Sequence, residues 1–131
     1  MTENYSNLNI WKDAVALAVS VYRVTREFPK EENYGLVSQL KRAVVSISSN
    51  VAEGSSRKSK KDFSRFVDIA IGSLHEVESL LIVSRELGYV SVDEQRILEE
   101  KLARLGKSLN AFRKFLVPRP SSAIRSPSSV A

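Results

Sequence analysis

Four segments of the sequence carry apolar residues at alternating steps of three and four, the spacing that places side chains on one face of an α-helix. The segments span about residues 10–28, 34–53, 59–87 and 91–117, and only the short links PKEEN, SSRKS and GYVS separate them. Short links between long amphipathic helices make neighbouring helices antiparallel. The sequence therefore predicts an all-α fold, an antiparallel up-down-up-down four-helix bundle.

The apolar stripes also predict the core of the bundle. We expect the following side chains to face inward: Trp11, Ala14, Val15, Ala18, Val21, Tyr22 and Thr25; Val37, Leu40, Val44, Ile47 and Val51; Phe63, Phe66, Ala70, Leu74, Val77, Leu81 and Ser84; Leu98, Leu102, Leu105, Leu109, Phe112 and Leu116. No run of alternating β-branched residues is long enough to predict a sheet.

Local signals predict where the helices begin and end. Pro29 ends the first helix, because the residue before a proline is pushed out of the helical conformation. Gly54 stands where a left-handed C-terminal cap is expected. Ser59 and Ser91 each precede an acidic residue three positions later, the spacing of a capping box that opens a helix.

The chain is predicted to contain one domain and a tail. Residues 1–117 form the four-helix bundle domain, a usual size for a single folding unit. Residues 118–131, PRPSSAIRSPSSVA, are rich in Pro and Ser and have no periodicity. We expect this tail to be disordered.

The positive charge is concentrated in one stretch of the sequence. The formal net charge is +5, and residues 41–65 contain seven cations against two acids, whereas the rest of the chain is balanced at thirteen of each. Cations at a helix N-terminus oppose the helix dipole, at a cost of about 0.3–1 kcal/mol each when unpaired. A stretch that tolerates this cost is typical of a phosphate-binding surface.

These cations are the candidate nucleic-acid-binding residues: Lys41, Arg42, Arg57, Lys58, Lys60, Lys61 and Arg65. Because no aromatic residue lies within the bend itself, the sequence predicts backbone contact with little reading of bases. The alternative is a solvated corner between two helices. The polar stretch at 46–53 has two interpretations, a functional polar surface near the basic bend and hydrogen bonding between helices. We favour bonding between helices, with Glu53 reaching Arg65 or Arg42.

Several kinds of chemistry are excluded by the residues themselves. There is no cysteine, so no disulfide or thiolate zinc site can form. GSSRKS has one glycine and lies between two helices, unlike a phosphate loop. His75 is the only histidine and Gly72 stands three residues before it, so a Glu-x-x-His di-iron site cannot be built. We expect no metal, no cofactor and no enzymatic activity.

The N-terminal sequence lacks the basic-then-apolar pattern of a signal peptide, and no apolar run approaches the roughly 18 residues of a membrane span. The sequence therefore predicts a soluble cytoplasmic protein without membrane contact.

The motifs IWKDA at 10–14, FPKEENYGL at 28–36, QLKRAVVSISSNVAEG at 39–54, and FSRF with GSLHEVES within 63–79 make the chain resemble a known family. This is the four-helix-bundle family of proteins encoded in 23S rRNA intervening sequences, and the resemblance covers about residues 8–116. It implies a bacterial cytoplasmic homopentamer. The fold is also similar to accessory proteins of diversity-generating retroelements, which associate with a reverse transcriptase and with nucleic acid through a basic surface.

Two functions are favoured by the sequence, ahead of a third and weaker hypothesis of an enzyme with a cryptic site at His75. The first is a non-enzymatic, oligomeric accessory protein that binds the backbone of RNA or DNA with the basic corner between the second and third helices. The second is a homo-oligomeric scaffold for an acidic protein partner, for example a polymerase.

Overall fold

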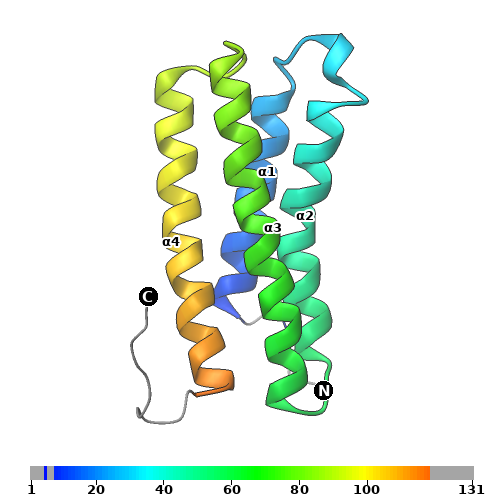
Figure 1. Cartoon of the computed structure of the whole chain (residues 1–131), viewed down its shortest axis with the longest axis vertical. Helices are drawn as coiled ribbons and strands as arrows, with labels where there is room; N and C mark the ends of the chain where they lie inside the picture. The colour runs from blue at the N-terminus through cyan, green and yellow to red at the C-terminus, as the bar shows by residue number, and fades with distance from the viewer. Residues whose placement is uncertain (1–4, 6–7, 119–131) are drawn as a thin grey trace, which may run out of the picture.

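The computed structural model describes Tyr5 and residues 8–118. These residues form four long helices: α1 (Asn9–Thr25), α2 (Leu36–Ser55), α3 (Lys60–Glu86) and α4 (Val92–Leu116) (Figure 1). A short 3₁₀ turn, η2 (Lys30–Glu32), interrupts the link between α1 and α2. The described part of the chain contains no strand, and the all-α prediction is confirmed.

The four helices are arranged as a square in which each helix packs on two neighbours. Contacts join α1 to α2, α2 to α3, α3 to α4, and α4 back to α1, whereas the diagonal pairs have no Cα atoms within 8 Å of each other. The helices run alternately up and down (Figure 1). The C-terminal end of α2, the N-terminal end of α3, the C-terminal end of α4 and the N-terminal end of α1 therefore share one end of the bundle, drawn at the bottom of the figure.

The core follows the predicted stripes closely on α2 and α4 and less closely on α1. All five predicted seam residues of α2 are buried, none more than 4 % exposed. On α1 the predicted stripe is rotated by part of a turn, because Leu17 is 1 % exposed whereas Tyr22 is 40 % exposed. At the start of α3 the ring of Phe63 is half-buried and Val67 is buried.

Both predicted serine caps are confirmed. The Ser59 hydroxyl accepts a hydrogen bond from the backbone N–H of Asp62 at 3.0 Å and opens α3. The Ser91 hydroxyl accepts from the N–H of Glu94 at 3.1 Å, and the Glu94 carboxylate accepts from the N–H of Ser91 at 3.1 Å. Such a cap stabilises a helix by about 0.5–2 kcal/mol.

The prediction that Gly54 caps α2 in a left-handed conformation is wrong. The helix continues through Ser55, and Gly88 is the glycine with a positive φ among the described residues. Gly54 is needed for space: a Cβ atom there would lie 2.7 Å from Cδ1 of Phe63 and 2.8 Å from Cβ of Phe66. The missing side chain therefore lets α2 and α3 approach closely just before the basic link.

None of the described helices combines the length and the apolar character needed to span a bilayer. The predicted disorder of the tail concerns residues 118–131, of which 119–131 lie outside the described residues.

Candidate nucleic-acid interface

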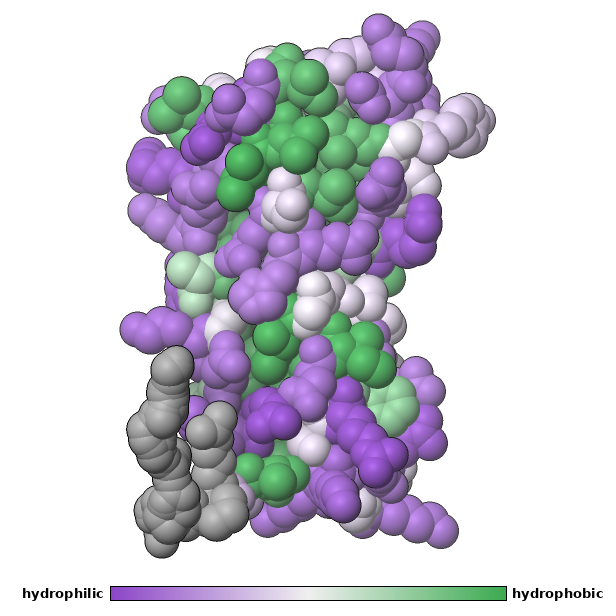
Figure 2. Space-filling model, viewed as in Figure 1, coloured by the Kyte–Doolittle hydropathy of each residue, from purple (hydrophilic) through white to green (hydrophobic). Residues whose placement is uncertain are grey.

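Five of the seven candidate cations lie at one end of the bundle. Arg57 and Lys58 belong to the link after α2, and Lys60, Lys61 and Arg65 lie on the first two turns of α3. All five are exposed. Figure 2 shows that hydrophilic residues dominate the lower end of the visible face, whereas apolar residues gather over its upper part. The predicted corner is thus an open, charged surface.

Lys41 and Arg42 do not belong to this corner. They lie 14 and 13 residues before Ser55, the last residue of α2, which corresponds to about 20 Å at 1.5 Å per residue. The ammonium of Lys41 lies 4.9 Å from the ring centroid of Tyr22, and Arg42 donates to the hydroxyl of Ser38 at 3.2 Å. Proximity in sequence placed these two cations in the predicted cluster, but the axis of α2 carries them away from it.

Among residues 5 and 8–118, the acids near the basic corner pair with two of its cations. Glu53 accepts from Arg57 at 2.9 Å, and Asp62 lies 4.0 Å from Arg65. Lys58, Lys60 and Lys61 have no carboxylate of a described residue within 4.0 Å. At this end of the bundle, three exposed lysines therefore have no acidic partner in the part of the chain that the structure describes.

The predicted bond from Glu53 to Arg65 or Arg42 is wrong. Because α2 extends to Ser55, Glu53 stands four residues before Arg57 and pairs with it within the same segment. Polar bonding between α2 and α3 does occur, but at Ser46, whose hydroxyl lies 2.8 Å from that of Ser73. Asn50 supports this contact by donating to the Ser46 hydroxyl at 2.9 Å.

The C-terminal turn of α4 adds residues that the sequence interpretation missed. The ammonium of Lys60 lies 4.8 Å from the ring centroid of Phe115. Phe115 stacks on Phe112, with ring centroids 6.1 Å apart and planes at 19°. In antiparallel helices joined by a short link, residues equally far before and after the link face each other. Applied to the link between α3 and α4, this register pairs the start of α3 with the end of α4.

Arg113 also reaches α3 from this turn. Its guanidinium donates two hydrogen bonds to the carboxylate of Asp68. The hydrogen bond to Asp68 and the charge of that carboxylate raise the pKa of Arg113 above its ordinary value. Asp68 is thereby neutralised by an α4 cation and does not offset the charge of the α3 lysines.

The whole bundle is polarised along its axis. The half formed by residues 8–17, 46–73 and 104–118 contains ten cations and four acids, a net charge of +6. The half formed by residues 18–45 and 74–103 contains eight cations and ten acids, a net charge of −2. Such a separation of charge attracts a polyanion to one end and orients it on approach.

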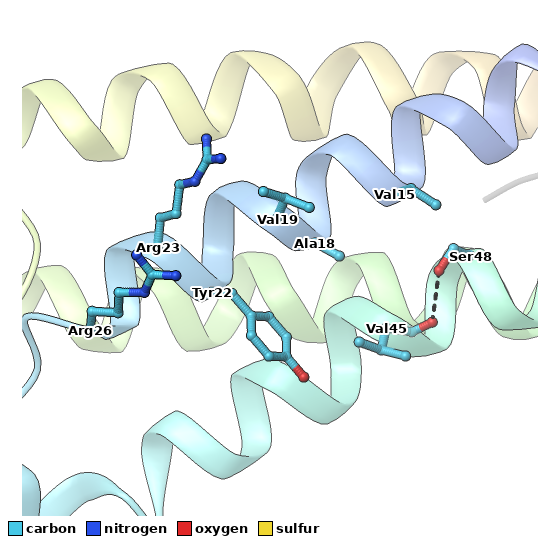
Figure 3. A pocket seen from close by; sticks show the side chains of 8 residues that line it. All are labelled: Val15, Ala18, Val19, Tyr22, Arg23, Arg26, Val45 and Ser48. Atoms are coloured by element: carbon cyan, nitrogen blue, oxygen red, sulfur yellow. Dashed lines mark hydrogen bonds between the residues drawn. The ribbon is translucent and has the colours of Figure 1, made fainter.

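A groove between α1 and α2 is the second notable feature of the surface. It encloses about 460 Å³ and is lined by Val15, Ala18, Val19, Tyr22, Arg23, Arg26, Val45 and Ser48. Figure 3 shows the two arginines at one end, Val15 at the other, and the Tyr22 ring reaching towards α2. Neither arginine has a carboxylate of a described residue within 4.0 Å.

The remaining candidate for chemistry is His75. It is exposed, and its Nδ1 lies 3.0 Å from the carboxylate of Glu78 on the next turn of α3. Within the described residues, no group of three or more His, Cys, Asp or Glu side chains is arranged to hold a metal ion. His75 therefore forms a surface pair.

The fold and the basic end place the protein in the class of four-helix bundles, with a charge distribution that is strongly polarised along the bundle axis. The chain belongs to the 23S rRNA-intervening sequence protein family, whose family model matches residues 6–111. It is similar in structure to a protein of unknown function from the S23 ribosomal protein family of Bacteroides thetaiotaomicron VPI-5482. That similarity has a TM-score of 0.72 at 19 % identity and covers 80 % of this chain and 98 % of the other, so it concerns the fold. No curated protein matches the sequence.

Proposed function

We propose that this protein is a non-enzymatic, oligomeric accessory protein that binds the phosphate backbone of RNA or DNA with the basic end of its bundle. The observation that carries the proposal is the presence of Lys58, Lys60 and Lys61 on the +6 half, where they are exposed and have no acidic partner among the described residues. An ion pair between exposed groups contributes only about 0–1 kcal/mol. Arg57 can therefore exchange Glu53 for a phosphate at little cost.

Binding to phosphates releases condensed counterions, so affinity depends steeply on salt. If Arg57, Lys58, Lys60, Lys61 and Arg65 each contact one phosphate of a single strand, the slope of log K against log salt concentration is about −3.5. Affinity then falls about 130-fold between 50 and 200 mM salt. A fluorescence-anisotropy titration of a labelled 20-nucleotide strand at several salt concentrations measures this slope. A flat dependence would remove the proposal.

Assembly into an oligomer would multiply the basic end. Apolar side chains on α3 support assembly, because Ile82, Val83 and Leu87 are all exposed on the upper part of the bundle. A homopentamer, which the family resemblance implies, would present five basic ends to one polyanion. Light scattering coupled to gel filtration tests this state, since the mass expected is about five times the 14.6 kDa of one chain. A mass of one chain would contradict the oligomeric part of the proposal.

A second candidate function is a scaffold for an acidic protein partner. The groove between α1 and α2 favours it, because an apolar wall that ends at Arg23 and Arg26 fits an amphipathic helix with acidic residues on its flank. Affinity capture from nuclease-treated cell extract tests this candidate. Retention of an acidic protein by the wild type, and its loss on replacing Arg23 and Arg26 by Gln, is the expected result for the scaffold.

A further inference from the structure

Phe115 is a large aromatic side chain that is exposed to solvent at the basic end of the bundle. It is 62 % exposed, although it lies on the last turn of a core helix. Phe112 supports it from within the molecule, since Phe112 packs edge-on against Phe63 with centroids 5.1 Å apart. A chain of three aromatic rings thus leads from the α3–α4 contact to the surface and fixes the outermost ring in place.

A cation occupies the space over this ring. The ammonium of Lys60 lies 4.8 Å from the Phe115 centroid. An exposed cation–π contact is worth about 0.5–1 kcal/mol, whereas a nucleobase stacked on an aromatic side chain is worth about 1–3 kcal/mol. A base can therefore replace the ammonium on the ring. The flexible lysine stem then leaves the ammonium free to bind the phosphate of the same or the next nucleotide.

We propose that Phe115 is a stacking platform for an unpaired base of a single-stranded nucleic acid, whose phosphates bind Lys58, Lys60 and Lys61. This inference rests on the proposed function and narrows its ligand from nucleic acid in general to single strands. A base inside a duplex is already stacked on its neighbours and cannot lie on the ring. A phenyl ring has no hydrogen-bonding group, so the platform accepts any base and selects strandedness rather than sequence.

The test compares Phe115→Leu with a matched control at the opposite end, Tyr34→Leu, where the aromatic side chain is 99 % exposed. Three ligands of equal length are used: a single strand, an abasic strand that keeps the phosphates, and a duplex. We expect Phe115→Leu to weaken binding of the single strand about 5- to 150-fold and to leave the other two ligands unchanged. Tyr34→Leu leaves all three unchanged, and ribose and deoxyribose versions show which sugar is preferred.

A conservative variant separates stacking from a structural role. Phe115→Tyr keeps the ring and should retain single-strand affinity, and thermal unfolding of each variant reports any loss of the folded state. Equal losses for the single strand, the abasic strand and the duplex would overturn the proposal, because Phe115 would then act only by positioning Lys60. Unchanged binding of the single strand by Phe115→Leu would overturn the stacking proposal too. The proposed function would then still be supported by a steep salt dependence of binding by the wild type. Absence of salt-dependent binding by the wild type would overturn both the stacking proposal and the proposed function.

Discussion

The basic end and the α1–α2 groove both present cations, but they set them in different surroundings. At the basic end, Lys58, Lys60 and Lys61 lie on an open hydrophilic surface with one exposed phenyl ring beside them. In the groove, Arg23 and Arg26 stand at the end of a concave wall of valine, alanine and tyrosine. The first arrangement fits a flexible polyanion with bases, and the second fits a folded acidic segment with an apolar side. The surroundings of a cation therefore indicate the kind of partner it binds better than its charge does.

The largest expected effect on nucleic-acid affinity comes from neutralising the cations of each region in a separate variant. Replacing Arg57, Lys58, Lys60 and Lys61 by Gln should lower affinity for a single strand about 10³-fold at 100 mM salt, because four phosphate contacts are lost. The matched control replaces Arg23, Arg26, Lys41 and Arg42 by Gln, the same change in charge in the other half of the bundle. Anisotropy titrations should show little change for this control. Equal losses in both variants would mean that net charge alone, and not its location, drives binding.

A second comparison tests how closely α2 and α3 must approach at the basic end. Gly54→Ala should destabilise the protein by about 1–2 kcal/mol, because a Cβ atom there collides with Phe63 and Phe66 and overpacking outweighs the gain in helix propensity. Gly72→Ala is the control on α3, since a Cβ at that position meets nothing within 4 Å. It should stabilise the fold by about 0.5–1 kcal/mol. Urea unfolding measures both, and destabilisation by the control but not by Gly54→Ala would contradict the packing described.

The smallest expected effect concerns the acid that pairs with Arg57. Glu53→Gln releases the guanidinium and adds one positive charge at the basic end, so nucleic-acid affinity should rise about three- to tenfold. The control is Glu100→Gln, which removes the acid paired with Arg96 at 3.6 Å in the other half. Affinity should not change in that variant. A decrease on Glu53→Gln would show that the ion pair positions Arg57 for binding.

The sequence predicts the helices well because their periodicity and caps are local properties. The seam of α2, the serine cap at Ser59 and the capping box at Ser91 are predicted correctly. The packing role of Gly54 is not predictable from the sequence, because it depends on Phe63 and Phe66, which contact Gly54 only when α3 packs on α2. The rotated stripe of α1 has a similar cause, since both Leu17 and Tyr22 suit a helix face and the packing of neighbours decides between them.

The candidate site was only partly predictable. The corner at residues 57–65 forms within one link and the turns beside it, so sequence proximity is a good guide there. Lys41 and Arg42 are close in sequence but separated by the length of α2, and Phe115 is distant in sequence but adjacent in space. The charge separation between the two halves likewise emerges only when four antiparallel helices are aligned.

Nucleic acid that purifies with the protein from cells tests most directly whether the basic end of the bundle binds nucleic acid. Wild type is purified at low salt in parallel with two variants, and the bound nucleic acid is quantified and sequenced. The basic-end variant replaces Arg57, Lys58, Lys60 and Lys61 by Gln, and the control variant replaces Arg23, Arg26, Lys41 and Arg42 by Gln. We expect the wild type and the control variant to retain nucleic acid that is enriched in unpaired segments, and the basic-end variant to lose it. Equal amounts in all three preparations, or none in the wild type, would contradict the central claim that the basic end of the bundle binds nucleic acid.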